Sequence, residues 1–112
     1  MTTTQKSITL KSKQKQFLRG LGHHLDAVVY VGREGLSDNL INSAMDALKT
    51  RELIKIKLGQ NCEVPKKEAA AQLAELTGAA LVQLLGKTVL LYLPNKDLKP
   101  DQRISLPKYS TS

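Results

Sequence analysis

The chain has 112 residues, 41% of them hydrophobic and 24% charged, and this size and composition suit a single compact domain. No run of about 18 apolar residues is present and the first residues are polar, so we expect neither a membrane-spanning helix nor a secretory signal. A lone cysteine excludes an internal disulfide and favours a reducing compartment, and we expect a cytoplasmic monomer.

Charge is the most informative bulk property, because 17 basic residues against 10 acidic ones leave a net charge of +7. Residues 1–25 contain five basic and no acidic residues, whereas the rest of the chain contains twelve basic and ten acidic residues. This asymmetry predicts a polyanionic partner, either a nucleic acid or an anionic membrane surface. The alternative is a basic helix that serves only solubility.

Residues 1–9 are polar and rich in threonine, and we expect them to be flexible. A first helix is predicted over residues 12–21, with Ser12 as its N-cap. Its apolar side chains can face a core (Leu10, Phe17, Leu18 and Leu21), while its basic side chains stay in water (Lys11, Lys13, Lys15 and Arg19). Residues 27–31 are a continuous apolar run rich in β-branched residues, which predicts a strand covered on both faces.

Ser37 can cap a second helix that reaches about residue 49 and carries its apolar residues on one face (Leu40, Ile41, Ala44, Met45 and Leu48). Residues 53–58 then alternate between an apolar side (Ile54, Ile56 and Leu58) and a basic side (Lys55 and Lys57). This alternation predicts a strand with one buried face and one wet, basic face.

A third helix is predicted over residues 65–77, because Pro65 suits a first helical turn and Gly78 suits the left-handed position after the last one. Strands over residues 80–85 and 88–93 follow, joined at Gly86 and Lys87 as in a type II′ hairpin. Residues 95–112 have little apolar periodicity, so we expect a C-terminal tail without a stable fold.

The predicted order of elements is therefore α-β-α-β-α-β-β, within one domain at residues 10–94. Strands joined through a helix should run parallel by the right-handed crossover rule, and the last pair should run antiparallel. The fold class is α/β, with a four-stranded mixed sheet packed with helices.

Motifs that would indicate catalysis or metal binding are weak. Residues 86–88 (GKT) resemble the end of a P-loop, but that motif needs a glycine where Leu81 stands and must open a helix. His23 and His24 are adjacent and lack partners for a metal site, so we expect ordinary loop residues, with a phosphate contact as the alternative. No spacing of carboxylates argues for an enzyme, and we predict no cofactor, no metal and no small-molecule substrate.

The turn Gly32-Arg33-Glu34-Gly35, between the first strand and the second helix, is the strongest candidate site. Its glycines allow a sharp turn and the close approach of another backbone, and the N–H groups that start the next helix carry partial positive charge. These features predict a phosphate-sized cradle, to which Arg33 can add a charge-assisted contact. Glu34 should point away from a phosphate, toward Arg33, a lysine or a base edge. An ordinary turn is the alternative, because the motif is short.

Its place in the chain adds weight to this turn. It follows the first strand, the basic first helix precedes that same strand, and Lys55 and Lys57 share a polar strand face, so a continuous basic surface beside the turn is expected. Aromatic residues are few (Phe17, Tyr30, Tyr92 and Tyr109, with no tryptophan). Their shortage argues against base-stacking platforms and for recognition of RNA backbone and shape.

Four segments together resemble the stand-alone bacterial CRM-domain proteins of the YhbY type: LKSKQKQFLRGL at residues 10–21, VGREGLS at 31–37, ELIKIK at 52–57 and LGKTVLLY at 85–92. The resemblance covers about residues 8–107. It implies a fold similar to the C-terminal domain of the third bacterial translation initiation factor. It also implies RNA binding through a GxxG loop analogous to that of KH domains, and association with precursors of the large ribosomal subunit.

We therefore predict a non-enzymatic RNA-binding protein that contacts ribosomal RNA and assists assembly of the large ribosomal subunit. The predicted RNA-binding residues are the loop and the basic residues around it (Gly32, Arg33, Glu34, Gly35, Lys11, Lys13, Lys15, Arg19, Lys55 and Lys57). The alternatives are a protein-interaction module that docks on ribosomal proteins or a translation factor, and a small enzyme that acts on nucleic acid.

Overall fold

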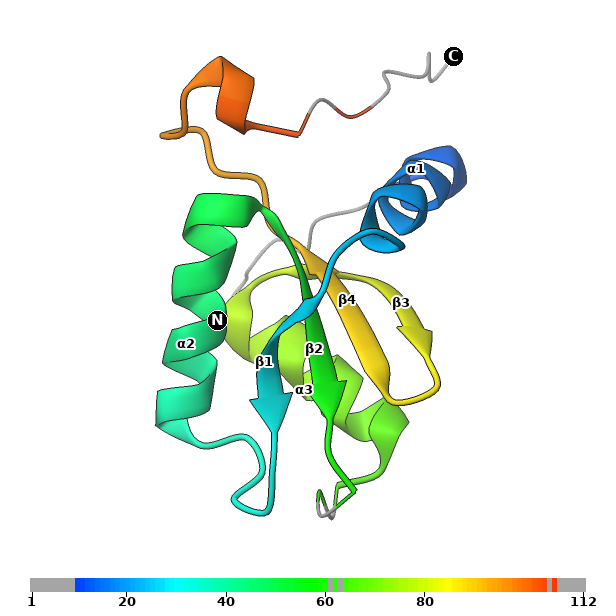
Figure 1. Cartoon of the computed structure of the whole chain (residues 1–112), viewed down its shortest axis with the longest axis vertical. Coiled ribbons are helices and arrows are strands. Elements are labelled where there is room, and N and C mark those ends of the chain that lie inside the picture. Colours follow the sequence, from blue (N-terminus) through cyan, green and yellow to red (C-terminus); the bar gives the residue numbers. More distant parts are fainter. Residues whose placement is uncertain (1–9, 61, 63, 105, 107–112) are drawn as a thin grey trace, which may run out of the picture.

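The helices and strands follow one another in the predicted order in the computed structural model, which describes residues 10–60, 62, 64–104 and 106 (Figure 1). These residues form the helices α1 (Ser12–Gly22), α2 (Asp38–Arg51) and α3 (Lys66–Thr77) and the strands β1 (Ala27–Val31), β2 (Leu53–Leu58), β3 (Ala80–Leu85) and β4 (Thr88–Tyr92). A short 3-10 helix, η1 (Pro100–Gln102), comes last. The predicted single α/β domain is confirmed, whereas the predicted flexible segment 1–9 lies outside the described residues.

The strands form one mixed sheet in the order β1-β2-β4-β3. β1 and β2, which are joined through α2, pair in parallel, and β4 pairs antiparallel with both β2 and β3. β2 and β3, joined through α3, therefore also run in the same direction, although β4 lies between them. Because β4 returns to the middle of the sheet, β1 and β3 become its two edges.

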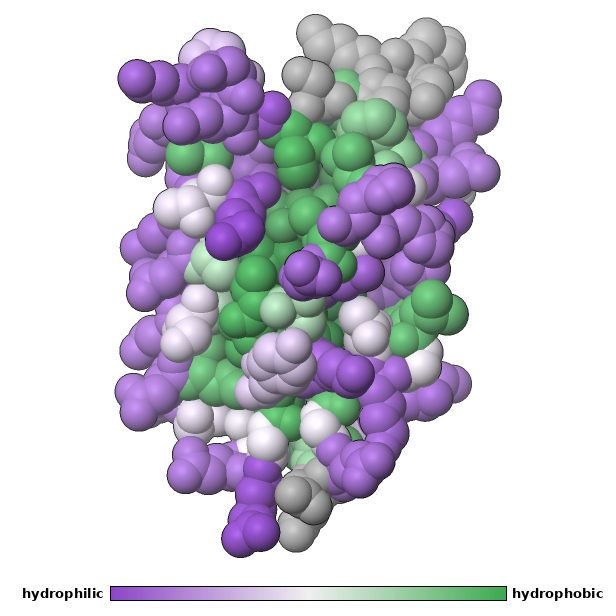
Figure 2. Space-filling view, viewed as in Figure 1, coloured by the Kyte–Doolittle hydropathy of each residue, from purple (hydrophilic) through white to green (hydrophobic). Residues whose placement is uncertain are grey.

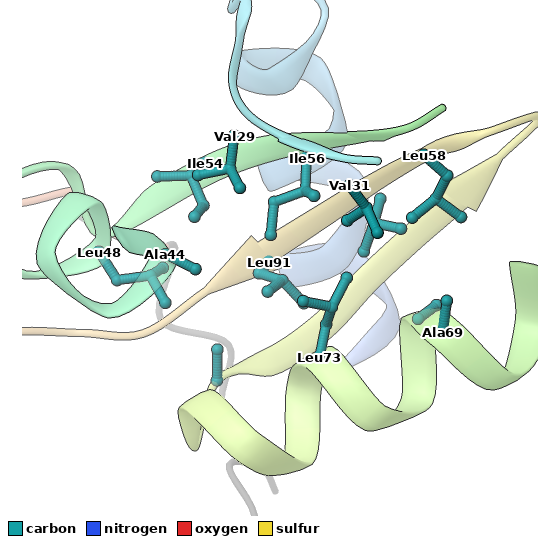
Figure 3. Close-up of a cluster of buried hydrophobic side chains, with 13 residues drawn as sticks. Val29, Val31, Ala44, Leu48, Ile54, Ile56, Leu58, Ala69, Leu73 and Leu91 are labelled. Atoms are coloured by element: carbon teal, nitrogen blue, oxygen red, sulfur yellow. The ribbon is translucent and has the colours of Figure 1, made fainter. Parts of the chain in front are cut away.

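The larger part of the core lies between the sheet and the two helices α2 and α3, which cover the same face (Figures 1 and 3). Ile54, Ile56 and Leu58 of β2 belong to this core, which confirms the predicted buried face. The other face is less open than predicted, because Leu53 is buried in the smaller cluster and Lys55 is half-buried. Leu48 of α2 and Leu73 of α3 meet them from the helices. The boundaries of α2 and α3 follow the predicted signals, because Ser37 caps α2 and Gly78, with a φ of 78°, ends α3.

The helix α1 covers the opposite face of the sheet, over β2, β4 and β3, and closes a second, smaller cluster. Leu18 is fully buried there and packs in one cluster with Leu53, Val82, Leu90 and Tyr92. The helix approaches the sheet closely at Gly22, where an added Cβ would lie 2.8 Å from a side-chain carbon of Leu90.

Two details of α1 differ from the sequence prediction. Its N-cap is Lys11 rather than Ser12, and the Lys11 N–H donates a hydrogen bond to the side-chain oxygen of Gln14 (3.0 Å). Phe17 and Leu21 remain 37% exposed, although both were expected to face the core. The physical reason is that a helix resting on a sheet buries only the residues that face the sheet, here Leu18 and Gly22.

The strand β1 also differs from the prediction of a strand covered on both faces. Val29 and Val31 are buried beneath α2 and α3, but Val28 and Tyr30 on the other face are 38% and 64% exposed. The prediction failed because β1 is an edge strand and α1 packs over its neighbours instead of over it. One apolar face of β1 is consequently open.

The C-terminal segment departs furthest from expectation, because the predicted absence of a stable fold is wrong for residues 95–104. The side chain of Glu52, between α2 and β2, is fully buried and holds this segment. Its carboxylate accepts hydrogen bonds from the N–H groups of Asn95 and Ile104 (2.6 Å each) and from Nε of Arg103 (3.2 Å). These partners lie 43–52 residues from Glu52 along the chain, beyond the reach of a local sequence pattern.

Candidate nucleic-acid interface

The loop between β1 and α2 is a tight β-turn, closed by a hydrogen bond from the Gly35 N–H to the Gly32 carbonyl oxygen (3.0 Å). Arg33 and Glu34 occupy its two central positions, and neither has a positive φ, as in a type I turn. Gly35 follows with a φ of 69°, which a residue with a Cβ adopts only at a cost. The turn therefore presents the exposed side chains of Arg33 and Glu34 at its tip.

The start of α2 adds backbone donors to this turn. The side-chain oxygen of Ser37 accepts from the Leu40 N–H (3.2 Å), and its carbonyl oxygen accepts from the Ile41 N–H (3.0 Å). The N–H groups of Asp38 and Asn39 have no acceptor among the described residues. Such unpaired donors at a helix start carry partial positive charge and attract anions.

The two glycines of the loop are present for different reasons. Gly35 is explained by its positive φ, which is a requirement of the fold. Gly32 has an ordinary φ, and a Cβ added to it would meet no atom within 4 Å. The contrast is Gly59, where an added Cβ would lie 2.9 Å from the carbonyl oxygen of Val31. Packing within the described residues therefore explains a glycine at position 59 but not at position 32.

An open pocket of about 640 Å³ lies against this loop. The loop forms one wall, Tyr30 of β1 another, and the first turns of α2 the third; the lining residues are Tyr30, Gly32, Arg33, Glu34, Gly35, Ser37, Asn39, Leu40 and Ser43. Sequence reasoning found the loop but missed Tyr30, Asn39 and Ser43. The continuous apolar run of β1 concealed Tyr30, because it gave no sign that alternate residues face different surroundings.

Lys57 is the predicted basic residue that the sheet brings nearest to this pocket in register. It is paired with Tyr30 on β1 and with Thr88 on β4, and it is exposed. Lys55 lies one step further along the same face, half-buried, and shares a small pocket with Arg19 of α1. The structure thus joins Lys57 to the loop region, and Lys55 to Arg19.

The lysines of α1 are placed elsewhere. Lys11 is the N-cap of α1, and Lys13 and Lys15 lie in its first half. Figure 1 shows α1 and the loop between β1 and α2 at opposite ends of the sheet. Figure 2, in the same orientation, shows apolar surface in the middle of this face, crossed by several hydrophilic side chains. The predicted basic residues thus form two parts, one at the start of α1 and one beside the loop, and a continuous basic surface between these parts stays a prediction.

The described residues contain no cluster of three or more histidine, cysteine or acidic side chains that could hold a metal ion. His23 lines the small pocket with Arg19 and Lys55, and His24 is exposed beside it. None of the helices formed by these residues is both long enough and apolar enough to span a bilayer.

Comparison with known proteins agrees with the fold and identifies the family. The chain matches the CRS1 / YhbY (CRM) domain over residues 10–92. The solution structure of the hypothetical protein SAV1595 from Staphylococcus aureus superposes with a TM-score of 0.73 at 39% sequence identity, and the match covers 88% of this chain and 100% of that one.

Curated relatives match over nearly their whole length. "Probable RNA-binding protein YqeI" of Bacillus subtilis is 43% identical over 98 residues, which is 88% of this chain and 99% of the relative. An "RNA-binding protein" of Haemophilus influenzae is 39% identical over 100 residues, which is 89% of this chain and 97% of the relative. With the domain match covering most of its length, the chain belongs to the CRS1 / YhbY (CRM) domain family.

Proposed function

We propose that the protein binds RNA and that residues 32–35, the GxxG loop, hold a phosphate of the RNA backbone. Membership of the CRM family, relatives named as RNA-binding proteins and a net charge of +7 support an RNA partner. The resemblance that places this family with precursors of the large ribosomal subunit makes ribosomal RNA the proposed target. The protein would act there as a non-enzymatic assembly factor.

The observation that carries the proposal is the open space at Gly32. An added Cβ there would touch nothing in the described fold, and the φ is ordinary, so the chain itself does not require glycine. A ligand backbone that approaches closely does require it. Arg33 and Asn39 line the same pocket as Gly32, and the N–H group of Asn39 has no acceptor among the described residues. A phosphate would meet both kinds of donor.

The test is the affinity for a ribosomal RNA fragment, measured by fluorescence anisotropy across a series of salt concentrations. Gly32→Ala should weaken binding about tenfold, because the methyl group holds the phosphate away from the backbone donors. Gly20→Ala is the matched control: Gly20 is also exposed and equally open, but it lies on α1. Gly35→Asp should weaken binding further, since it places a carboxylate beside the phosphate.

The proposal for the loop fails if Gly32→Ala and Gly35→Asp bind with the affinity and salt slope of the parent protein. Binding to ribosomal components that resists both salt and nuclease would instead favour the protein-interaction alternative. The assembly role has a separate test, which is sedimentation of a cell extract on a sucrose gradient. We expect co-migration with precursors of the large subunit, and migration as free protein at low salt would contradict that role.

A further inference from the structure

We propose that the pocket beside the GxxG loop receives one unpaired base of the bound RNA, stacked on the ring of Tyr30 and selected by the carboxylate of Glu34. This inference rests on the proposed function and adds to it the class of RNA that the protein prefers. The target would be a single strand, a bulge or a loop with a base that carries an amino group, and a continuous duplex would bind less well.

The position of Tyr30 is the first observation. Its side chain is 64% exposed, the largest exposed fraction among the large hydrophobic residues described, and it lines the pocket together with the loop. It lies on the open face of β1, which α1 leaves uncovered, and the exposed Lys57 is its partner in register on β2. An exposed ring beside a cationic side chain is the arrangement on which proteins stack bases of single-stranded nucleic acid.

The second observation concerns the carboxylate of Glu34. Within the described part of the chain its carboxylate makes no hydrogen bond and no ion pair, neither with Arg33 nor with a lysine. It lines the same pocket as Tyr30. Because an ionised carboxylate only accepts hydrogen bonds and repels phosphate, its suitable partner in RNA is an amino group on a base edge, such as N4 of cytosine.

The third observation concerns the size and the opposite wall of the pocket. Its volume of about 640 Å³ lies within the range of roughly 300–1,000 Å³ that holds small ligands, so a nucleotide can enter. Asn39 and Ser43 of α2 are exposed along that wall and can donate to or accept from a base. A base that is paired within a helix cannot turn into such a pocket unless it leaves the stack.

The scarcity of aromatic residues does not oppose this inference. It argues against a sheet-wide platform that stacks several bases, whereas the pocket needs one ring for one base. Tyr30 has the proposed phosphate site of the loop as one neighbour and the cationic Lys57 as another. Both can neutralise phosphates of a single RNA strand while one of its bases stacks on the ring.

The experiment measures the binding of oligo(C), of oligo(U) and of an RNA stem with nearly the same number of phosphates, by anisotropy across a series of salt concentrations. The stem is a blunt-ended duplex without a loop, so that it contains no unpaired base. The parent should prefer the single strands to the stem and oligo(C) to oligo(U). Tyr30→Thr, which keeps the β-branched character of an edge strand, should bind the single strands about tenfold more weakly with an unchanged salt slope, because stacking is lost and no phosphate contact is. Tyr30→Phe should bind like the parent, and Glu34→Gln should abolish the preference for oligo(C).

Leu85→Ala is the matched control, because Leu85 is 62% exposed and lies at the other edge of the same sheet row, beyond Lys57 and Thr88. It should leave binding unchanged. The base site is overturned if Tyr30→Thr binds like the parent, if Leu85→Ala is equally impaired, or if the stem binds as tightly as the single strands. In those cases a loss with Gly32→Ala would still support the phosphate site. Parent-like binding by Gly32→Ala and Gly35→Asp would instead remove the loop itself.

Discussion

The two ends of α2 each carry a glutamate next to a turn, and they are opposite in character. At the N-terminal end, Glu34 is exposed and has no partner among the described residues. At the C-terminal end, Glu52 is fully buried and accepts three hydrogen bonds. Burying a carboxylate costs free energy unless hydrogen bonds or an opposite charge compensate it, whereas an exposed carboxylate is solvated and remains available to a ligand. The comparison separates an end that holds the fold together from an end that is available for binding.

The backbone shows the same contrast. The loop at the N-terminal end uses a glycine for its positive φ, while Glu52 adopts a φ of 61° without being a glycine. A glutamate in this conformation is strained, and glycine is the usual residue at such a helix end. The three hydrogen bonds that the Glu52 carboxylate accepts act against this strain. Its partners Asn95, Arg103 and Ile104 fasten the C-terminal segment to the domain.

The largest effect is expected on the free energy of unfolding, at the C-terminal end of α2. Glu52→Ala should lower the free energy of unfolding by about 3–5 kcal/mol, because it leaves the donors of Asn95, Arg103 and Ile104 without their buried acceptor. Chemical denaturation checks this, with Glu34→Ala as the matched control at the open end. Equal free energies of unfolding for the two variants would show that the hydrogen bonds of Glu52 do not stabilise the fold.

The next effect is expected at the open end and concerns RNA affinity alone. Arg33→Ala should weaken RNA binding about tenfold and reduce the magnitude of the salt slope by about 1, because one phosphate contact is lost. Its free energy of unfolding should match that of the parent, since Arg33 makes no hydrogen bond or ion pair with the described residues. An unchanged salt slope would exclude Arg33 as a phosphate ligand.

A smaller effect distinguishes the two parts of the basic surface. Lys57→Gln should weaken RNA binding about threefold, because Lys57 is paired in register with Tyr30 beside the pocket. Lys11→Gln should weaken it less than about twofold, because Lys11 caps α1 at the other end of the sheet. The two affinities, measured at the same salt concentration, would reverse if the RNA followed α1 instead of the loop.

The smallest effect appears only at alkaline pH. Burial raises the pKa of the Tyr92 phenol, and the negative charge of Glu52 raises it further, while Arg103 lowers it. The folded state therefore favours the neutral phenol. This contribution is complete below the unfolded pKa of about 10 and is lost as the pH rises through the higher folded pKa. The melting temperature should thus fall less steeply above pH 10 in Tyr92→Phe than in the parent, with Tyr30→Phe as the exposed control.

Much of this fold was predictable because its signals are local. Ser37 begins α2 with a side-chain acceptor, Gly78 ends α3 in a left-handed conformation, and the alternation at residues 53–58 matches a half-buried strand. The loop at residues 32–35 was predictable for the same reason, since two glycines at a strand-to-helix junction form a short-range pattern. The role of its residues in RNA binding stays a prediction.

The remainder could not be predicted, because it depends on which elements meet. The run at residues 27–31 indicates a strand, but only the sheet order makes β1 an edge with Tyr30 exposed. The charges of α1 are visible in the sequence, but only its packing over β2, β4 and β3 separates them from the loop.

The sequence by itself determined the order of the elements, their caps and the position of the glycine loop, because these follow from contacts between residues a few positions apart. Only the tertiary structure decided the surroundings of the two glutamates. The carboxylate of Glu52 is buried and accepts hydrogen bonds from the C-terminal segment, whereas Glu34 is exposed and lines the pocket with Tyr30. The physical reason is that burial and hydrogen-bond satisfaction depend on groups brought together from distant parts of the chain, such as Glu52 and Ile104, which are 52 residues apart.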